Sequence, residues 1–271
     1  MAEVTHNTAA AHRTKIQRTM DLSDRPAFWT SVGRWLLSSG NSAAHFLALL
    51  LVSPFSRSAA WGIYRHWGRT AFRIFHITAS LRDDNNGDLG PKPHLYVWLN
   101  QSSLTDTVAL AQVLPPFYAI GNIEYAAMPF LGWAIVPLRF VVIVRQWREQ
   151  AIRGIDRACQ RLASGETWLI STEGSRTPNG ELLPFKKGPA VLAIKAQATI
   201  IPLAIHGARV VMPTGEWRIR PGHIEIHLLH ALATKGLTYD DRDVLLEKLR
   251  RLAQLELGAT TSPHARDRGI E

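Results

Sequence analysis

From residue 94 onward the sequence alternates short apolar runs with longer segments of helical periodicity, and this alternation is the strongest constraint on the fold. The runs that predict strands are residues 94–99, 117–120, 140–144, 167–171, 199–205 and 223–229. The segments that predict helices are residues 105–113, 146–164, 189–196 and 242–257, in which apolar residues recur at helical spacing. Strands and helices in alternation favour an α/β fold with a mainly parallel central sheet flanked by helices.

The sequence before this alternating part has a different composition and divides into three parts. Residues 1–25 carry scattered charges without periodicity, which predicts a disordered tail. Residues 26–81 are rich in aromatic and basic side chains and predict an N-terminal helical segment. Residues 82–93 are a cluster of turn-forming residues, so we place the α/β domain at residues 82–258 and a polar tail at 259–271.

Residues 26–81 have the character of amphipathic helices that bind a membrane surface. Aromatic residues are interleaved with basic ones, and this segment contains no acidic residue. Such helices partition into the head-group region, where their arginines reach anionic phosphates. Packing of a helical hairpin on the rest of the chain is one alternative, and stacking on single-stranded nucleic acid is another.

The longest apolar run, residues 43–55, bears on these alternatives. It is too apolar for a nucleic-acid groove, so we expect no nucleic-acid partner. It is also interrupted by His45 and Pro54 and is shorter than the about 20 residues that cross a bilayer. We therefore expect a peripheral or monotopic association with a phospholipid membrane surface, without a helix that spans it.

The charge and the cysteine content limit the partners and the compartment. The chain has 31 basic and 22 acidic side chains, for a net charge of +9, which favours anionic partners such as phospholipid head groups, a phosphorylated substrate or nucleic acid. The single cysteine, Cys159, excludes an intrachain disulfide and suggests a reducing compartment. No secretory signal is apparent in the first 25 residues, so we expect the cytoplasmic side of the membrane.

Polar segments that could carry chemistry follow three of the predicted strands. In open parallel sheets, ligand sites form beyond the carboxyl ends of the strands. One such segment is residues 100–106, Asn-Gln-Ser-Ser-Leu-Thr-Asp; its simplest interpretation is a helix cap. The second is residues 171–176, Ser-Thr-Glu-Gly-Ser-Arg, which indicates an anion site or a solvated surface turn. The third begins at His206.

Four sequence blocks in a fixed order resemble the glycerolipid acyltransferase family, typified by 1-acylglycerol-3-phosphate acyltransferase. They are residues 100–106, residues 129–133 (Pro-Phe-Leu-Gly-Trp) with 142–145 (Val-Ile-Val-Arg), residues 173–176 (Glu-Gly-Ser-Arg) with 185–188 (Phe-Lys-Lys-Gly), and residues 201–205 (Ile-Pro-Leu-Ala-Ile). The resemblance implies transfer of an acyl group from acyl-CoA or acyl-carrier protein to a lysophospholipid hydroxyl, in phospholipid biosynthesis. It implies no metal and no cofactor beyond the acyl donor as co-substrate.

The first block of that family reads Asn-His-x-Ser-x-x-Asp, in which the histidine is the general base and the aspartate orients it. Ser103 and Asp106 match this pattern, whereas Gln101 stands at the histidine position. A glutamine has no titratable nitrogen. The resemblance assigns Gln101 and Asp106 to the reacting centre and Ser103 to substrate binding, and it leaves a lipid-binding protein without catalysis as the alternative function.

The other matching positions concern the acceptor and a possible substitute base. Arg145 falls where the family binds the acceptor phosphate. The third block, which holds the acceptor, supplies Glu173, Gly174, Ser175 and Arg176. His206 would lie at the same sheet edge as Asp106 if its strand is parallel to residues 94–99, so it is one candidate base. A carboxylate with a raised pKa, Asp106 or Glu173, is the other.

Residues His223, Glu225 and His227 share one face of an alternating strand. They could bind a metal ion, but the apolar residues between them favour a solvent-facing polar row on a sheet covered only on its other face.

Overall fold

The structure, a computed structural model, describes residues 26–122, 132–143 and 148–258. The helices are α2 (Phe28–Val52), α3 (Arg57–Ile74), α4 (Thr105–Val113), α6 (Arg148–Ala163), α7 (Gly188–Ala196), α8 (Ala208–Val211) and α9 (Arg242–Leu257), with 3-10 turns at Gly132–Ala134 and Tyr239–Asp241. The strands are β1 (Ile77–Asp83), β2 (His94–Trp98), β3 (Tyr118–Asn122), β4 (Val141–Ile143), β5 (Trp168–Ser171), β6 (Thr199–His206) and β7 (Gly222–Leu228).

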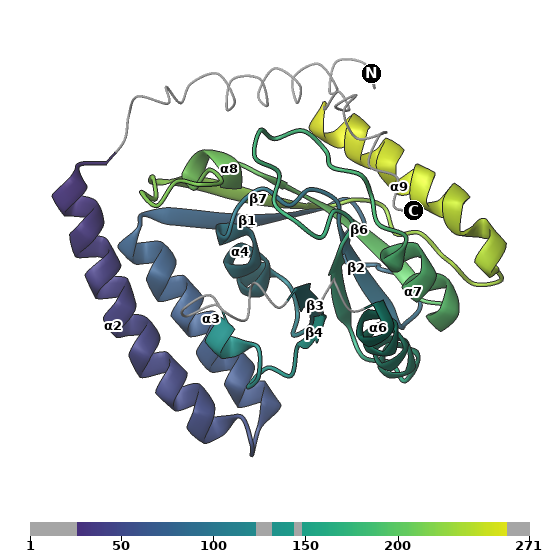
Figure 1. Cartoon of the computed structure of the whole chain (residues 1–271), viewed down its shortest axis with the longest axis horizontal. Helices are drawn as coiled ribbons and strands as arrows, with labels where there is room; N and C mark the ends of the chain where they lie inside the picture. The colour runs from purple at the N-terminus through teal and green to yellow at the C-terminus, as the bar shows by residue number, and fades with distance from the viewer. Residues whose placement is uncertain (1–25, 123–131, 144–147, 259–271) are drawn as a thin grey trace.

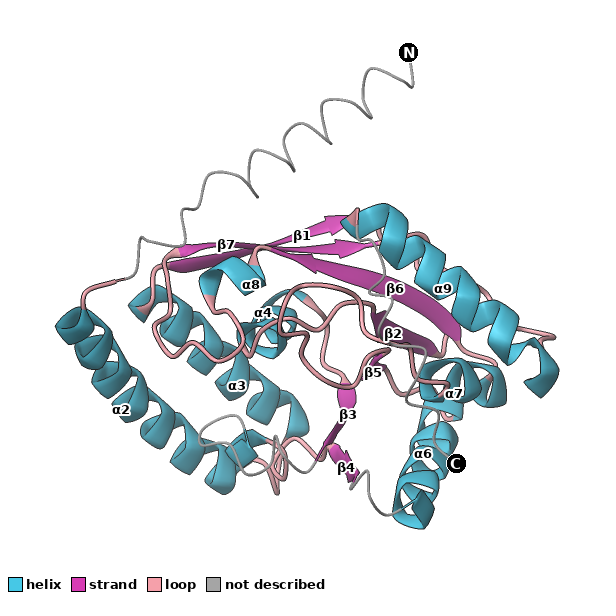
Figure 2. Ribbon diagram, turned by 45° about the horizontal axis from the view of Figure 1, so that its top comes forward, coloured by secondary structure: helices cyan, strands magenta, loops and turns pink. Residues whose placement is uncertain are grey.

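The strands form one sheet with the order β1-β7-β6-β2-β5-β3-β4 (Figure 2). Neighbouring strands are parallel except for β6 and β7, which are antiparallel. The pairing of β2 with β6 is parallel, as the sequence analysis expected, so both strands end at the same edge. The predicted α/β fold with a mainly parallel sheet is confirmed.

Alternation along the strands divides the core into two layers, one on each face of the sheet. Leu95 and Val97 of β2 pack with α6, α7 and α9, whereas Tyr96 and Trp98 pack with α3 and α4. Such alternation is what a strand buried on both faces requires. Figure 1 shows α9 and α7 on one side of the sheet and α4 and α3 on the other.

The helix α2 is the outermost layer, since α3 lies between it and the sheet (Figures 1 and 2). The aromatic residues of α3, which the sequence analysis expected at a lipid boundary, are instead buried: Trp61, Tyr64, Trp67 and Phe72 belong to the core. The reason is tertiary, because α3 has α2 on one side and α4 on the other. Two of its arginines are also used inside the protein, since Arg65 donates to the carbonyl oxygens of Ala111 and Leu114 at the end of α4, and Arg57 donates to Phe117.

The strand β1 and the short helix α8 were not predicted. The sequence analysis assigned residues 77–81 to the helical segment 26–81, whereas these residues begin the sheet by pairing with β7. The residues of β1 alternate between apolar and polar, but the strand follows α3 almost directly and only Ile77 is buried, so it was grouped with the helical segment. The expected tails, residues 1–25 and 259–271, lie outside the described residues.

Candidate active site

The loop between β2 and α4 is held by two buried carboxylates that accept hydrogen bonds from three consecutive backbone amides. The amide of Gln101 donates to Glu173 Oε2 at 2.5 Å. The amides of Ser102 and Ser103 donate to Asp106 Oδ2 at 2.9 and 2.8 Å. The N-cap residue of α4, Leu104, has no side-chain cap. Instead Asp106, in the first turn of α4, accepts the two loop amides, and Ser103 Oγ accepts the amide of Thr105 at 3.2 Å.

Asp106 is fully buried, and burial raises the pKa of its carboxyl group to about 7. The amides of Ser102 and Ser103 and the positive charge of Arg176 act in the opposite direction, by stabilising the charged form. Within the described part of the chain, Asp106 Oδ1 has no hydrogen-bond partner. A buried carboxylate with a pKa near neutrality and one uncommitted oxygen has the properties of a general base.

Glu173, the first residue of the third block, joins two loops. Its Oε1 accepts a hydrogen bond from the amide of Leu183 at 2.6 Å, while its Oε2 accepts from Gln101. Burial raises the pKa of the Glu173 carboxyl group to about 7, against the effect of these two amides. Because both oxygens are occupied by backbone groups, Glu173 holds the first and third blocks together, whereas the family resemblance assigned it to the acceptor.

The turn after β5 brings the rest of the third block against the same loop. Ser171 Oγ accepts hydrogen bonds from the amides of Glu173 and Gly174, at 3.3 and 3.1 Å. Gly174 has a φ of 67°, a conformation that favours glycine. The amide of Thr177 then donates to the carbonyl oxygen of Gln101 at 2.8 Å. These contacts place the half-buried Arg176 close enough to Asp106 for its charge to affect that carboxyl group.

Asn100 and Ser103 connect the first block to the segment after β6. The Asn100 side-chain amide donates to the carbonyl oxygen of Ile205 at 2.7 Å and accepts from the amide of the same residue at 2.8 Å. Ser103 Oγ donates to the carbonyl oxygen of Met212 at 2.9 Å. Sequence reasoning found these polar residues but not their partners, which lie more than 100 positions away along the chain.

His206 does not join this site. Its strand neighbours Leu203 and Ile205 face α4, so alternation turns the His206 side chain to the opposite face, where Nε2 lies 2.9 Å from Glu256 Oε1 of α9. The hypothesis that His206 replaces the missing base is therefore wrong for this conformation. Arg145, the predicted phosphate ligand, lies outside the described residues.

Comparisons with known proteins agree with this description. The family model described as Acyltransferase matches residues 85–206. The 1-acyl-sn-glycerol-3-phosphate acyltransferase of Pseudomonas aeruginosa is 27% identical over 177 residues, which cover 64% of this chain and 68% of that protein. The corresponding Chlamydomonas reinhardtii protein is 31% identical over 197 residues, which cover 69% of this chain and 58% of that protein.

Among solved structures, the 1-acyl-sn-glycerophosphate acyltransferase PlsC of Thermotoga maritima has the same fold, with a TM-score of 0.67 and 22% sequence identity, over 86% of this chain and 97% of that one. The family match and the fold together indicate an acyltransferase domain built on a mostly parallel sheet. Residues 85–206 match the acyltransferase family, and the resemblance drawn from the four blocks is confirmed. The matched part of this chain spans little more than half the length of several curated relatives, the Chlamydomonas protein among them.

Proposed function

We propose that this protein is a lysophospholipid O-acyltransferase that transfers an acyl group from acyl-CoA or acyl-carrier protein to a lyso-lipid such as 1-acylglycerol-3-phosphate. The observation that carries the proposal is the buried Asp106 carboxylate, which accepts the two amides that follow Gln101, at the sheet edge where the loops after β2, β5 and β6 meet. The relatives, which are named as 1-acyl-sn-glycerol-3-phosphate acyltransferases, support the choice of acceptor.

In the proposed mechanism, Asp106 takes the place of the histidine as general base. As the acceptor oxygen attacks the thioester carbonyl carbon, Asp106 Oδ1 accepts the hydroxyl proton; when the tetrahedral intermediate collapses, the thiolate leaves and receives that proton. The side-chain amide of Gln101 contributes hydrogen bonding at the reacting centre. General-base help of this kind is worth about 100- to 10,000-fold in rate.

The third block supplies the acceptor site in this proposal. The positive charge of Arg176 acts on the Asp106 carboxyl group, and its planar guanidinium matches the oxygens of a phosphate. Gly174 and Ser175 form the turn that presents it. Arg145 belongs to the same site by family resemblance.

The arrangement of α2 supports docking on a phospholipid membrane. The buried residues of α2 are Ser31, Ser38, Ser42 and Leu49, and Trp67 Nε1 donates to Ser42 Oγ at 2.9 Å. Large apolar residues point outward instead: Phe28, Trp29, Leu36, Leu37, Leu47, Leu50, Leu51 and Phe55. A helix whose outer side faces water carries polar residues on that side, whereas the outer side of α2 is apolar. An exposed apolar surface of this size is typical of a surface that contacts lipid.

The length and charge of this region fit the same role. By length and composition α2 is long and apolar enough to cross a bilayer, which differs from the expectation of interfacial helices alone. Arg69 and Arg73 of α3 are exposed, and we propose that they reach lipid phosphates. We propose that the acyl-transfer domain lies on the cytoplasmic side.

An acyl-transfer assay on anionic vesicles tests the function. Labelled acyl-CoA and labelled acyl-carrier protein are offered with a panel of lyso-lipids, and the native chain is compared with Gln101→His. We expect the native chain to acylate a phosphate-bearing acceptor. A native chain that is silent with every donor and acceptor, together with activity of Gln101→His, would refute the proposal and would favour the alternative, a lipid-binding protein that lost its base at Gln101.

A further inference from the structure

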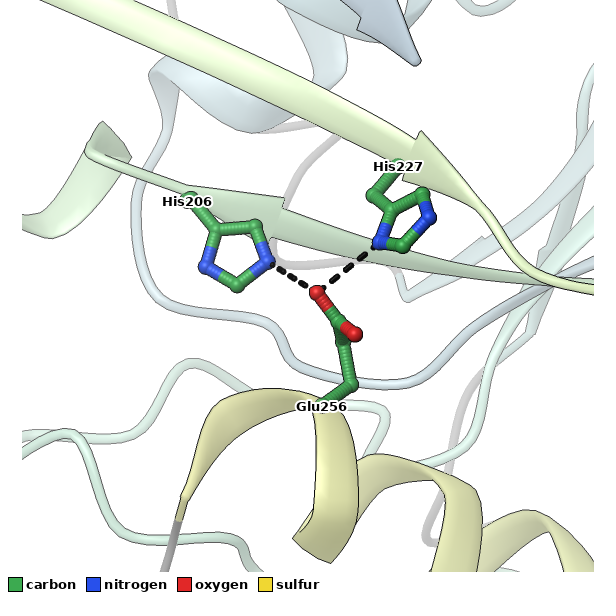
Figure 3. A group of neighbouring side chains, drawn as sticks. All are labelled: His206, His227 and Glu256. Carbon is green, nitrogen blue, oxygen red and sulfur yellow. Dashed lines mark hydrogen bonds and ion pairs between the residues drawn. The ribbon is translucent and has the colours of Figure 1, made fainter. Parts of the chain in front are cut away.

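Three potential metal ligands from different elements meet on the α9 face of the sheet (Figure 3). They are His206 at the end of β6, His227 in β7 and Glu256 in the last turn of α9. His206 Nε2 and His227 Nδ1 lie 2.9 and 2.8 Å from the same oxygen, Glu256 Oε1. The three ligand atoms lie within 4.8 Å of one another.

This cluster lies outside the proposed acyl-transfer site. Asp106 belongs to α4, which packs on the other face of the sheet. Gly207, with a φ of 82°, follows His206 directly and turns the chain back toward β7. The row that sequence analysis expected to face solvent is exposed at His223 but buried at His227, because the last turn of α9 covers this end of the strand.

The donor set selects one class of metal ion. Two imidazole nitrogens and one carboxylate oxygen suit zinc and its transition-metal neighbours, whereas magnesium and calcium prefer oxygen ligands alone. In a tetrahedral zinc site, bonds of about 2.1 Å hold the ligand atoms about 3.4 Å apart. In such a site the His206 and His227 nitrogens would lie about 0.5 Å farther from Glu256 Oε1 than they do in the structure.

A second carboxylate lies beside the other ring nitrogen of His227. His227 Nε2, the ring nitrogen that faces away from Glu256, lies 2.8 Å from Asp84 Oδ2. Histidines that bind metals commonly direct their other nitrogen to a carboxylate, which fixes the ring and strengthens the ligand. The side chain of His227 is 2% exposed and that of His206 is 25% exposed, so the cluster is shielded but open to solvent on one side.

We propose that His206, His227 and Glu256 bind a divalent transition-metal ion of the zinc class, with Asp84 orienting His227. The ion replaces the protons that now lie between the two imidazoles and Glu256, and it fastens α9 to β6 and β7. A fourth position, on the solvent side near His206, is left for water. The proposed role of the ion is structural: it would fix the end of β6. That strand end also supports the first block, because Asn100 bonds to Ile205, the residue before His206.

Metal titration of the full chain, purified in detergent and stripped with a chelator, tests this proposal. Zinc chloride is followed by calorimetry and thermal unfolding, and cobalt chloride by its visible spectrum. We expect one ion per chain, a tetrahedral cobalt spectrum, and a melting temperature raised by about 5 to 10 °C at zinc concentrations about 100 times the dissociation constant. Magnesium chloride is expected to produce no such stabilisation.

Variants assign the effect to this cluster. His206→Gln and His227→Gln should abolish the zinc-dependent rise in melting temperature. The matched control is His223→Gln, which removes an exposed histidine from the same strand and should keep the rise. The proposal is overturned if zinc does not bind stoichiometrically, or if zinc still stabilises His206→Gln. If His227→Gln fails to fold, the result for His206→Gln alone decides. None of these readouts depends on acyl transfer.

Discussion

The buried Asp106 carboxyl group makes a quantitative prediction about stability and pH. Its pKa rises from the ordinary value of 3.8 to about 7 because the charged form loses its solvation on burial. Between these two values the folded chain holds a proton that the unfolded chain has released. The contribution of Asp106 to the free energy of unfolding is therefore present at acidic pH and is lost as the pH rises from about 4 to about 7.

The substitution Asp106→Asn removes this ionisation while keeping an oxygen that can accept the Ser102 and Ser103 amides. With the pKa values above, the free energy of unfolding of the variant, relative to the native chain, should rise by about 2 to 3 kcal/mol between pH 5 and pH 8. Urea unfolding in a mild detergent, followed by tryptophan fluorescence at both pH values, measures this difference. The full ionisation penalty, reached above pH 7, is about 4 kcal/mol.

Because the variant is compared with the native chain at each pH, the titration of groups that do not interact with Asp106 cancels from the difference. Asp240→Asn, at an exposed position, is the matched control and should show no change with pH. A stability difference between Asp106→Asn and the native chain that stays constant within about 0.5 kcal/mol from pH 5 to pH 8 would show that Asp106 is not a buried, raised-pKa group.

Other substitutions test the loop contacts, the membrane face and the core. Glu173→Ala leaves two buried amides without their acceptor and should lower the free energy of unfolding by about 2 to 4 kcal/mol in urea titrations; an unchanged midpoint would show that Glu173 does not hold the first and third blocks together. Leu37→Glu combined with Leu51→Glu should reduce sedimentation with anionic vesicles by at least about tenfold, and undiminished binding would exclude this face of α2. Leu249→Ala, at a fully buried position of α9, should destabilise the chain by about 2 to 5 kcal/mol in the same urea assay, and a loss below about 1 kcal/mol would contradict its tight packing.

The features that the sequence predicted well depend on short-range periodicity. The helices 105–113 and 242–257 begin and end at the predicted residues, because apolar spacing and flanking residues define them locally. The strand β1 was missed because it is an edge strand held by backbone pairing with β7, about 145 positions later. Likewise, the sequence did not reveal that β7 runs antiparallel to β6.

The site was predicted in part, for a related physical reason. Family blocks located Gln101, Asp106 and Arg176, which the structure does bring to one edge of the sheet. The role of Glu173 could not be predicted, because its partners are backbone amides of two other loops. Alternation along β6 could have shown that His206 shares a face with Ile200 and not with Ile201, but only the packing of α9 places Glu256 against it.

The central claim is that this chain catalyses acyl transfer with Asp106 in place of the family's histidine. The direct measurement is the rate of thiol release from acyl-CoA on anionic vesicles that contain 1-acylglycerol-3-phosphate, for the native chain and for Asp106→Asn, after both are shown to be folded. We predict turnover by the native chain and a loss of at least about 100-fold in the variant. A folded Asp106→Asn chain that retains the native rate would contradict the account.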